Sequence, residues 1–173
     1  MGIRLIAFDV DGTLTTGALV LGAEGEAYKI FHARDGLAIS LAHRMGYLTG
    51  VVTGRSSAPV QRRAAELSMD FAVMDAADKV AAMEALRARY GLAWEEIAYM
   101  GDDLNDLALM ERAGLSGCPA DGAEEIRRAA DFLSAFPGGR GAARDFVEYI
   151  LKREGRWEEA VRSFRGRGPA VSQ

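Results

Sequence analysis

Two aspartates, Asp9 and Asp11, follow an apolar run in the stretch LIAFDVDGTLTTG. Carboxylates are costly where a strand leaves a core unless a partner or a ligand holds them. Further polar groups follow other apolar runs: Thr53-Gly54-Arg55, Lys79 and the acidic stretch GDDLND at 101–106. Phosphoryl transfer through magnesium uses this combination of several carboxylates, one lysine and one hydroxyl. Mg²⁺ takes carboxylate oxygens, a lysine and a hydroxyl hold phosphoryl oxygens, and a carboxylate can become a covalent aspartyl-phosphate.

Apolar segments typical of buried strands alternate with amphipathic segments typical of helices. The predicted strands are 3–8, 47–52, 71–74, 97–100, 115–118 and 131–134. The predicted helices repeat apolar residues about every four positions, over 37–45, 60–67, 80–90 and 104–108. This alternation predicts an α/β fold with a doubly wound, Rossmann-like parallel sheet covered by helices on both faces. In such a sheet ligands bind beyond the carboxyl ends of the strands, where the polar groups fall.

Residues 17–31 interrupt the alternation with two short β-type runs around a glycine-rich turn, and they predict a β-hairpin. The segments between the polar groups are too short for a cap domain over the site. A chain of 173 residues fits one domain. We therefore expect a single domain over residues 1–165, with the hairpin at 17–31 and a flexible C-terminal tail over 166–173.

The formal net charge of −4 argues against binding of nucleic acid through bulk charge. A single cysteine, Cys118, excludes an internal disulfide and a cysteine-based zinc site. No apolar run approaches the roughly 20 residues that cross a bilayer, and strand-like sequence begins at Ile3 in place of a signal peptide. These features predict a cytoplasmic protein without a membrane partner. From Lys152 onward six basic residues face three acidic ones, and we interpret this as a mobile basic segment near an anionic substrate.

The order D-x-D-G-T, T-G-R, K and G-D-D-x-x-D resembles the haloacid dehalogenase superfamily of phosphatases. Within it, FHARDGLAIS, TGRSS and FPGGRGAARDFVEYIL resemble the 3-deoxy-D-manno-octulosonate 8-phosphate phosphatase family, over roughly residues 3–165. The resemblance implies a Mg²⁺-dependent phosphatase that hydrolyses a sugar-acid phosphate through an aspartyl-phosphate. It also implies a homotetramer in which the hairpins assemble and a neighbour helps to close each active site.

The resemblance further implies a role for each acidic residue. Asp9 is implied as the nucleophile and a magnesium ligand. Asp11 is implied as the general acid and then the general base, with its backbone carbonyl facing the metal. Asp102 is implied as the third protein ligand, supported by Asp103 and Asp106.

Phosphate and sugar contacts are also implied. Thr53 and Lys79 would hold the phosphoryl group. The implied substrate contacts are Asp11, His32, Ala33, Arg34, Asp35, Gly36, Gly54, Arg55, Arg63 and Lys79. The flexible GGRG turn at 138–141 carries Arg140, and whether this residue or the C-terminal tail closes a neighbouring site stays open.

Three other functions stay open from the sequence. A nine-carbon keto acid, such as 2-keto-3-deoxynononate 9-phosphate, could be the substrate, although Arg55 favours the eight-carbon acid. A signalling receiver domain also gathers carboxylates, a hydroxyl and a lysine around magnesium, but it has no counterpart of Asp11. A non-catalytic assembly module is the third, and the intact pair of Asp9 and Asp11 argues against it.

Overall fold

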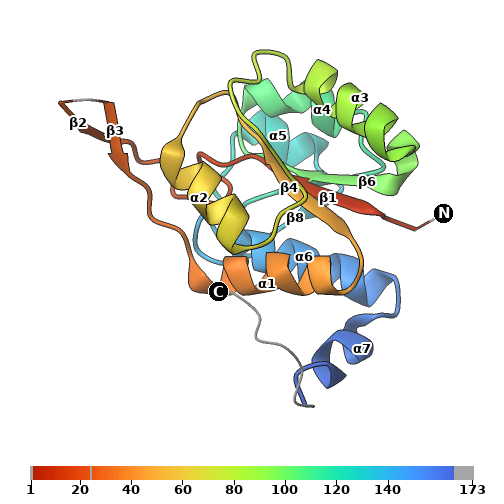
Figure 1. Ribbon diagram of the computed structural model, residues 1–173. Coiled ribbons are helices and arrows are strands. Elements are labelled where there is room, and N and C mark those ends of the chain that lie inside the picture. The colour runs from red at the N-terminus through yellow and green to blue at the C-terminus, as the bar shows by residue number, and fades with distance from the viewer. Residues whose placement is uncertain (1, 24, 166–173) are drawn as a thin grey trace.

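The chain forms a six-stranded parallel sheet with a separate two-stranded hairpin, as the computed structural model of residues 2–23 and 25–165 shows (Figure 1). The order in the sheet is β5-β4-β1-β6-β7-β8, and every neighbouring pair is parallel. The strands are β1 (Leu5–Phe8), β4 (Leu48–Val52), β5 (Phe71–Val73), β6 (Ile97–Met100), β7 (Leu115–Cys118) and β8 (Phe132–Leu133). The predicted doubly wound α/β fold is confirmed, because each predicted strand forms within two residues of its expected bounds.

Helices cover both faces of this sheet (Figure 1). On one face lie α1 (Ala33–Arg44), α2 (Ala58–Glu66), α6 (Ala142–Arg153) and α7 (Trp157–Arg162). On the other lie α3 (Lys79–Tyr90), α4 (Leu107–Met110) and α5 (Glu124–Ala129). Alternate side chains of β1 serve the two cores: Ile6 and Phe8 pack on the first face, and Leu5 and Ala7 on the second. Burial of β1 on both faces explains its continuous apolar sequence.

Local side-chain chemistry sets the bounds of α3 and thereby the place of Lys79. The carboxylate of Asp78 accepts a hydrogen bond of 2.9 Å from the backbone N–H of Ala81 and caps the N-terminus. Gly91 ends the helix in the left-handed conformation at φ 61°, where a side chain would be strained. Lys79 is therefore the first residue of α3, directly after the loop that leaves β5.

The predicted hairpin forms from β2 (Val20–Gly22) and β3 (Gly25–Tyr28), which pair antiparallel and project from the body of the molecule (Figure 1). Several large apolar side chains on and around it are exposed, including Leu21 at 66%, Tyr28 at 57% and Ile30 at 72%. An isolated two-stranded hairpin is marginally stable in water, so this segment needs further contacts to hold its shape.

The prediction of a mobile basic segment from residue 152 onward is wrong for residues 152–162. Lys152 lies in the last turn of α6, and Arg162 ends α7. Helix α7 packs against the body: Ala160 is fully buried, and the Arg156 guanidinium donates a hydrogen bond of 2.9 Å to the Met45 carbonyl. An amphipathic pattern of buried residues thus outweighs the local excess of positive charge. The predicted tail over 166–173 lies outside the described residues.

Helix α6 is attached to α1 through a carboxylate that belongs to α1. Asp35, 2% exposed, accepts hydrogen bonds from the backbone N–H groups of Gly141 (3.1 Å) and Arg144 (2.8 Å). These N–H groups at the start of α6 have no partner within their own helix. Asp35 therefore supplies the cap that the sequence around Gly141 lacks.

We expect Asp35→Ala to lower the free energy of unfolding by about 2–3 kcal/mol, because it leaves buried N–H groups without an acceptor. Urea unfolding at fixed protein concentration measures the change. Glu125→Ala, at an exposed position in the first turn of α5, is the control and should stay within about 0.5 kcal/mol of the parent protein. A loss of the same small size for Asp35→Ala would show that the cap is not important.

Candidate active site

The carboxyl ends of β1, β4 and β6 meet around a cavity of about 490 Å³. Because β1 pairs in parallel with both β4 and β6, the residues that follow the three strands reach the same edge of the sheet. The cavity is lined by Asp9, Asp11, Thr53, Gly54, Arg55, Asp102, Asp103, Leu104 and Asn105. The structure thus brings together three of the segments that the sequence singled out.

Gly12 allows the loop after β1 to pass directly over Asp102. Its φ is +92°, and a Cβ atom at this position would lie 1.9 Å from Asp102 Oδ2. The next residue, Thr13, donates a hydrogen bond of 3.1 Å from its hydroxyl to Asp102 Oδ1. The glycine and threonine of D-x-D-G-T therefore connect the β1 loop to the β6 loop.

The loop before α6 packs against the same turn. The Gly139 N–H donates a hydrogen bond of 2.9 Å to the Thr13 carbonyl, and a Cβ at Gly138 would lie 1.7 Å from the Gly12 carbonyl oxygen. The adjacent glycines Gly138 and Gly139 of FPGGRG hence permit close contact of two backbones that are far apart in the sequence.

A buried ion cluster lies at the end of β1. The Lys79 ammonium lies 2.7 Å from Asp9 Oδ1 and 2.6 Å from Asp106 Oδ1, and the Tyr99 hydroxyl donates to the same Asp106 oxygen at 2.6 Å. All four side chains are almost or fully buried. Burial lowers the pKa of Lys79, but the charges of Asp9 and Asp106 outweigh it and raise this pKa, so the ammonium stays charged. Lys79 holds the Asp9 carboxylate in place, and it is not among the residues that line the cavity.

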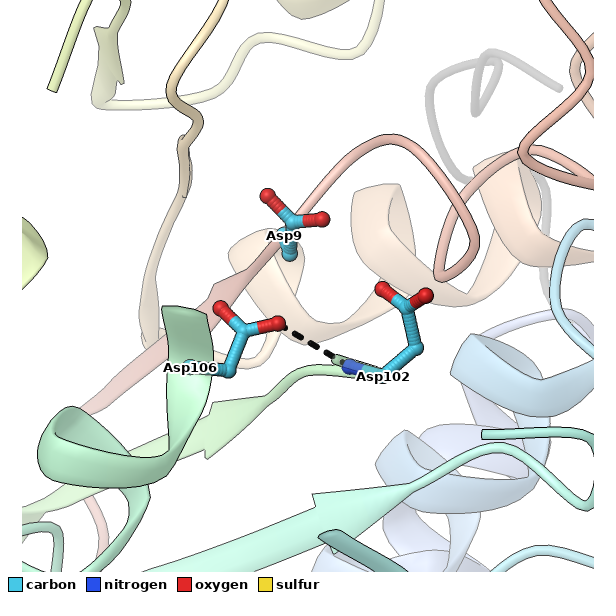
Figure 2. A group of neighbouring side chains, drawn as sticks. All are labelled: Asp9, Asp102 and Asp106. Atoms are coloured by element: carbon cyan, nitrogen blue, oxygen red, sulfur yellow. Dashed lines mark hydrogen bonds between the residues drawn. The ribbon is translucent and has the colours of Figure 1, made fainter. Parts of the chain in front are cut away.

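Three carboxylates, those of Asp9, Asp102 and Asp106, gather close enough to share a cation (Figure 2). Each offers an oxygen within 4.8 Å of the others. Asp106 already uses both oxygens: Oδ1 in the ion cluster, and Oδ2 for the backbone N–H groups of Asp102 (3.0 Å) and Asp103 (3.3 Å). Asp9 and Asp102 therefore fit as ligands of a hard cation, and Asp106 fits as the residue that positions the loop.

The electrostatics of this group favour a bound cation. Burial, followed by the charge of Asp106, raises the pKa of Asp9 to about 6 even though Lys79 opposes the shift. Burial, followed by the charges of Asp9 and Asp106, raises the pKa of Asp102 to about 8. Three carboxylates around one ammonium leave an excess of negative charge, which a divalent cation would neutralise.

Asp11 contacts a lysine that the sequence analysis missed. Lys29 Nζ lies 2.5 Å from Asp11 Oδ1, and Arg55 Nε lies 3.7 Å from Asp11 Oδ2. Lys29 follows β3 of the hairpin. The scarcity of lysine could have indicated Lys29, because the chain has only three lysines, at positions 29, 79 and 152. Two of them contact Asp9 and Asp11.

Asp103 lines the cavity but uses its carboxylate locally. Its Oδ1 accepts a hydrogen bond of 2.8 Å from the Leu104 N–H and caps the short 3₁₀ turn Leu104–Asp106. This turn carries Asp106 back toward the β6 loop. The predicted supporting role of Asp103 stays a prediction.

The other predicted substrate contacts do not line this cavity. Five of them open α1 or precede it: His32, Ala33, Arg34, Asp35 and Gly36. Asp35 caps α6, and His32 Nδ1 lies 3.6 Å from its carboxylate. Arg63, on α2, pairs with Glu66 at 2.9 Å and lines a second cavity of about 430 Å³ between α2 and the hairpin. Their roles in substrate binding stay predictions.

Comparisons with known proteins agree with this fold and site. A family model described as haloacid dehalogenase-like hydrolase matches residues 73–143. The structure of 3-deoxy-D-manno-octulosonate 8-phosphate phosphatase from Moraxella catarrhalis, solved with magnesium, phosphate and KDO, superposes with a TM-score of 0.90. It is 36% identical and covers 94% of this chain and 93% of its own. The fold and the site thus define a haloacid dehalogenase-like hydrolase.

Two further relatives narrow the assignment. The 3-deoxy-D-manno-octulosonate 8-phosphate phosphatase of Escherichia coli K12 is 36% identical over 158 residues, which cover 91% of this chain and 84% of that protein. The cobalt-bound phosphatase structure from Haemophilus influenzae is 34% identical, with a TM-score of 0.90 over 95% of this chain and 98% of its own. This chain belongs to the 3-deoxy-D-manno-octulosonate 8-phosphate phosphatase family and is a phosphoric monoester hydrolase. None of the helices between residues 2 and 165 combines the length and apolarity that crossing a bilayer requires.

We expect Mg²⁺ to raise the melting temperature of chelator-treated protein by about 5 °C or more, because a cation at 100 times its Kd adds about 2.7 kcal/mol of stability. Differential scanning fluorimetry measures the shift. Asp102→Asn should remove most of it. Asp75→Asn, at an exposed position in the loop after β5, should keep it. An unchanged shift in Asp102→Asn would rule out Asp102 as a ligand.

The rise in melting temperature that Mg²⁺ causes should become larger as the pH increases. The raised pKa of Asp102 means that the folded state binds this proton more tightly than the unfolded state does. The stability that protonation contributes is therefore present below about pH 4 and is lost as the pH rises toward about 8. Mg²⁺ binds the deprotonated carboxylates, so the Mg²⁺-dependent shift should be larger at pH 8 than at pH 5.5. An equal shift at both values would contradict the charge argument.

Proposed function

We propose that this protein hydrolyses 3-deoxy-D-manno-octulosonate 8-phosphate to the free sugar acid and inorganic phosphate in a reaction that requires Mg²⁺. The observation that carries the proposal is the cavity at the ends of β1, β4 and β6, with Asp9 held by Lys79 and Asp11 two residues further on. The names of the relatives support the substrate, as does the Moraxella catarrhalis structure with magnesium, phosphate and KDO.

In the first step, an Asp9 oxygen attacks phosphorus and forms the aspartyl-phosphate. The phosphorus–oxygen ester bond breaks, and its electron pair moves to the C8 oxygen of the sugar. The carboxyl group of Asp11 gives its proton to that oxygen, so the sugar leaves as an alcohol. Asp9, Asp102 and the Asp11 carbonyl would hold Mg²⁺, which when bound supplies positive charge to the phosphoryl oxygens.

In the second step, the ionised Asp11 takes a proton from water, and the water oxygen attacks phosphorus. The bond from phosphorus to Asp9 breaks, its electron pair returns to the carboxylate, and inorganic phosphate leaves. Lys79 stabilises the returning Asp9 charge at 2.7 Å, and Thr53 holds a phosphoryl oxygen from the end of β4. Both residues are nearly fully buried, so they are positioned before the substrate arrives.

Arg55 is proposed to bind the carboxylate or the hydroxyls of the sugar acid. Arg55 lines the cavity and its side chain is 46% exposed, so it can move toward a substrate. Arginine suits this contact because its planar fork matches a carboxylate.

A homo-oligomer is proposed as the working form. The cavity is open, and the exposed Leu21, Tyr28 and Ile30 give the hairpin an apolar surface that a second copy would cover. In that form, Arg63 and the start of α1, which do not line the cavity of their own chain, would lie near the cavity of a neighbour. The tetramer itself stays a prediction.

We expect Asp9→Asn to keep the fold and abolish phosphate release, because an amide cannot form the aspartyl-phosphate. Asp11→Asn should lower the rate of phosphate release by about 10²–10⁴-fold, which is the usual contribution of general acid–base catalysis. Phosphate release from 3-deoxy-D-manno-octulosonate 8-phosphate, with 2-keto-3-deoxynononate 9-phosphate in parallel, measures both. Turnover by purified Asp9→Asn would exclude the covalent mechanism. If the parent protein prefers the nine-carbon acid phosphate, the proposed eight-carbon substrate is wrong.

We expect Arg55→Ala to lower kcat/KM for the sugar-acid phosphate by about 10–100-fold, mainly through KM, because one charge-assisted contact contributes about 1.5–3 kcal/mol. The kcat/KM for p-nitrophenyl phosphate, which has no carboxylate, should change much less. Arg128→Ala on the exposed face of α5 is the control. Equal losses on the two substrates would assign Arg55 to phosphate binding or to the fold.

A further inference from the structure

Lys29 is buried although the segment that carries it is exposed. Its side chain is 2% exposed, whereas those of its neighbours Tyr28 and Ile30 point to solvent. Burial of an ammonium group is costly unless anions compensate it. Two do so: Glu26 Oε1 and Asp11 Oδ1 each lie 2.5 Å from Lys29 Nζ.

Lys29 pairs with the carboxylate of Glu26 as well as with that of Asp11. The Glu26 side chain is 8% exposed, and burial raises its pKa, but Lys29, Ser57 and Arg55 outweigh burial and lower this pKa below its usual range. Glu26 therefore stays ionised and holds the ammonium from the hairpin side. With Glu26 in place, Lys29 is fixed between the hairpin and the loop after β1.

The two oxygens of Asp11 have different surroundings. Oδ1 is bonded to the buried Lys29, whereas Oδ2 is enclosed and has no hydrogen-bond partner among the described residues. Arg55 Nε lies 3.7 Å from Oδ2, on a side chain that is 46% exposed. One oxygen is thus held by a fixed cation, and the other faces a cation that is free to move toward a substrate.

We propose that Lys29 is a positioning residue that fixes the Asp11 carboxyl group through Oδ1, so that Oδ2 carries the proton used in catalysis. The proposal rests on the proposed function, in which Asp11 acts as the acid. When the ester bond breaks and its electron pair moves to the leaving oxygen, the proton on Oδ2 passes to that oxygen, and Oδ1 keeps its bond to Lys29. The hairpin then has a part in the chemistry, because it carries both Lys29 and Glu26.

The test uses aryl phosphates whose phenols differ in acidity, from p-nitrophenyl phosphate to phenyl phosphate, with purified full-length protein and Mg²⁺. A good leaving group departs without a proton, so only the poor leaving groups need the acid. We expect Lys29→Met to lower kcat/KM for phenyl phosphate by about 10–100-fold, part of the usual general acid–base contribution, and for p-nitrophenyl phosphate by less than about 3-fold. Lys29→Arg keeps a cation and should recover most of the loss.

Two controls separate this role from a structural one. Lys152→Met removes the exposed lysine of α6 and should leave kcat/KM unchanged for both substrates. Melting temperature and size by light scattering report whether Lys29→Met still folds and assembles. A fold defect in Lys29→Met would lower kcat/KM for both substrates by the same factor, so the dependence on the leaving group would not become steeper and Lys29→Arg would have no steepening to reverse.

The outcomes distinguish the two proposals. If Asp11→Asn steepens the dependence on the leaving group and Lys29→Met does not, the positioning role of Lys29 is wrong and the acid role of Asp11 stands. If Asp11→Asn leaves the dependence unchanged, Asp11 is not the acid, and both proposals fail. A steeper dependence in both variants, reversed in Lys29→Arg, supports the positioning role.

Discussion

The ion cluster of Lys79, Asp9 and Asp106 is the constraint on which the rest of the site depends. Charges buried at this depth are stable only when they are paired and hydrogen-bonded, and Lys79 contacts both carboxylates at 2.6–2.7 Å. The cluster fixes the Asp9 carboxylate after β1. Through the Asp106 oxygens it also fixes the backbone of the β6 loop, and so the place of Asp102. The one set of ion pairs thereby orients two of the three carboxylates toward a shared cation.

Close backbone contacts complete this arrangement. Gly12 lets the β1 loop lie against Asp102, and Gly138 lets the loop before α6 lie against Gly12. Helix α6 is in turn capped by Asp35 from α1. The site is therefore supported by segments from both ends of the chain, and a change in the packing of α1 on α6 would reach the loop that carries Asp11.

Each of the two aspartates after β1 forms an ion pair with a different lysine. Lys79 comes from a helix of the core and holds Asp9, while Lys29 comes from the hairpin and holds Asp11. The difference in origin is physically meaningful. The position of Asp9 depends on the sheet and its helices, whereas the lysine that contacts Asp11 belongs to a projecting segment with exposed apolar side chains. The position of Asp11 therefore depends on the hairpin as well as on the sheet.

The sequence by itself determined the parallel sheet, the hairpin and the segments that form the site. Burial on both faces produces continuous apolar strands, and parallel pairing brings the residues after β1, β4 and β6 to one edge, so local patterns were sufficient. Only the tertiary structure decided that Asp35 caps α6, that Arg63 faces a second cavity, that residues 152–162 are helical and packed, and that Lys29 reaches Asp11. These features depend on contacts between residues far apart in the chain, and on the burial of charged side chains, which local periodicity does not encode. A lysine on a hairpin looks like a solvated residue until the fold encloses it between two carboxylates.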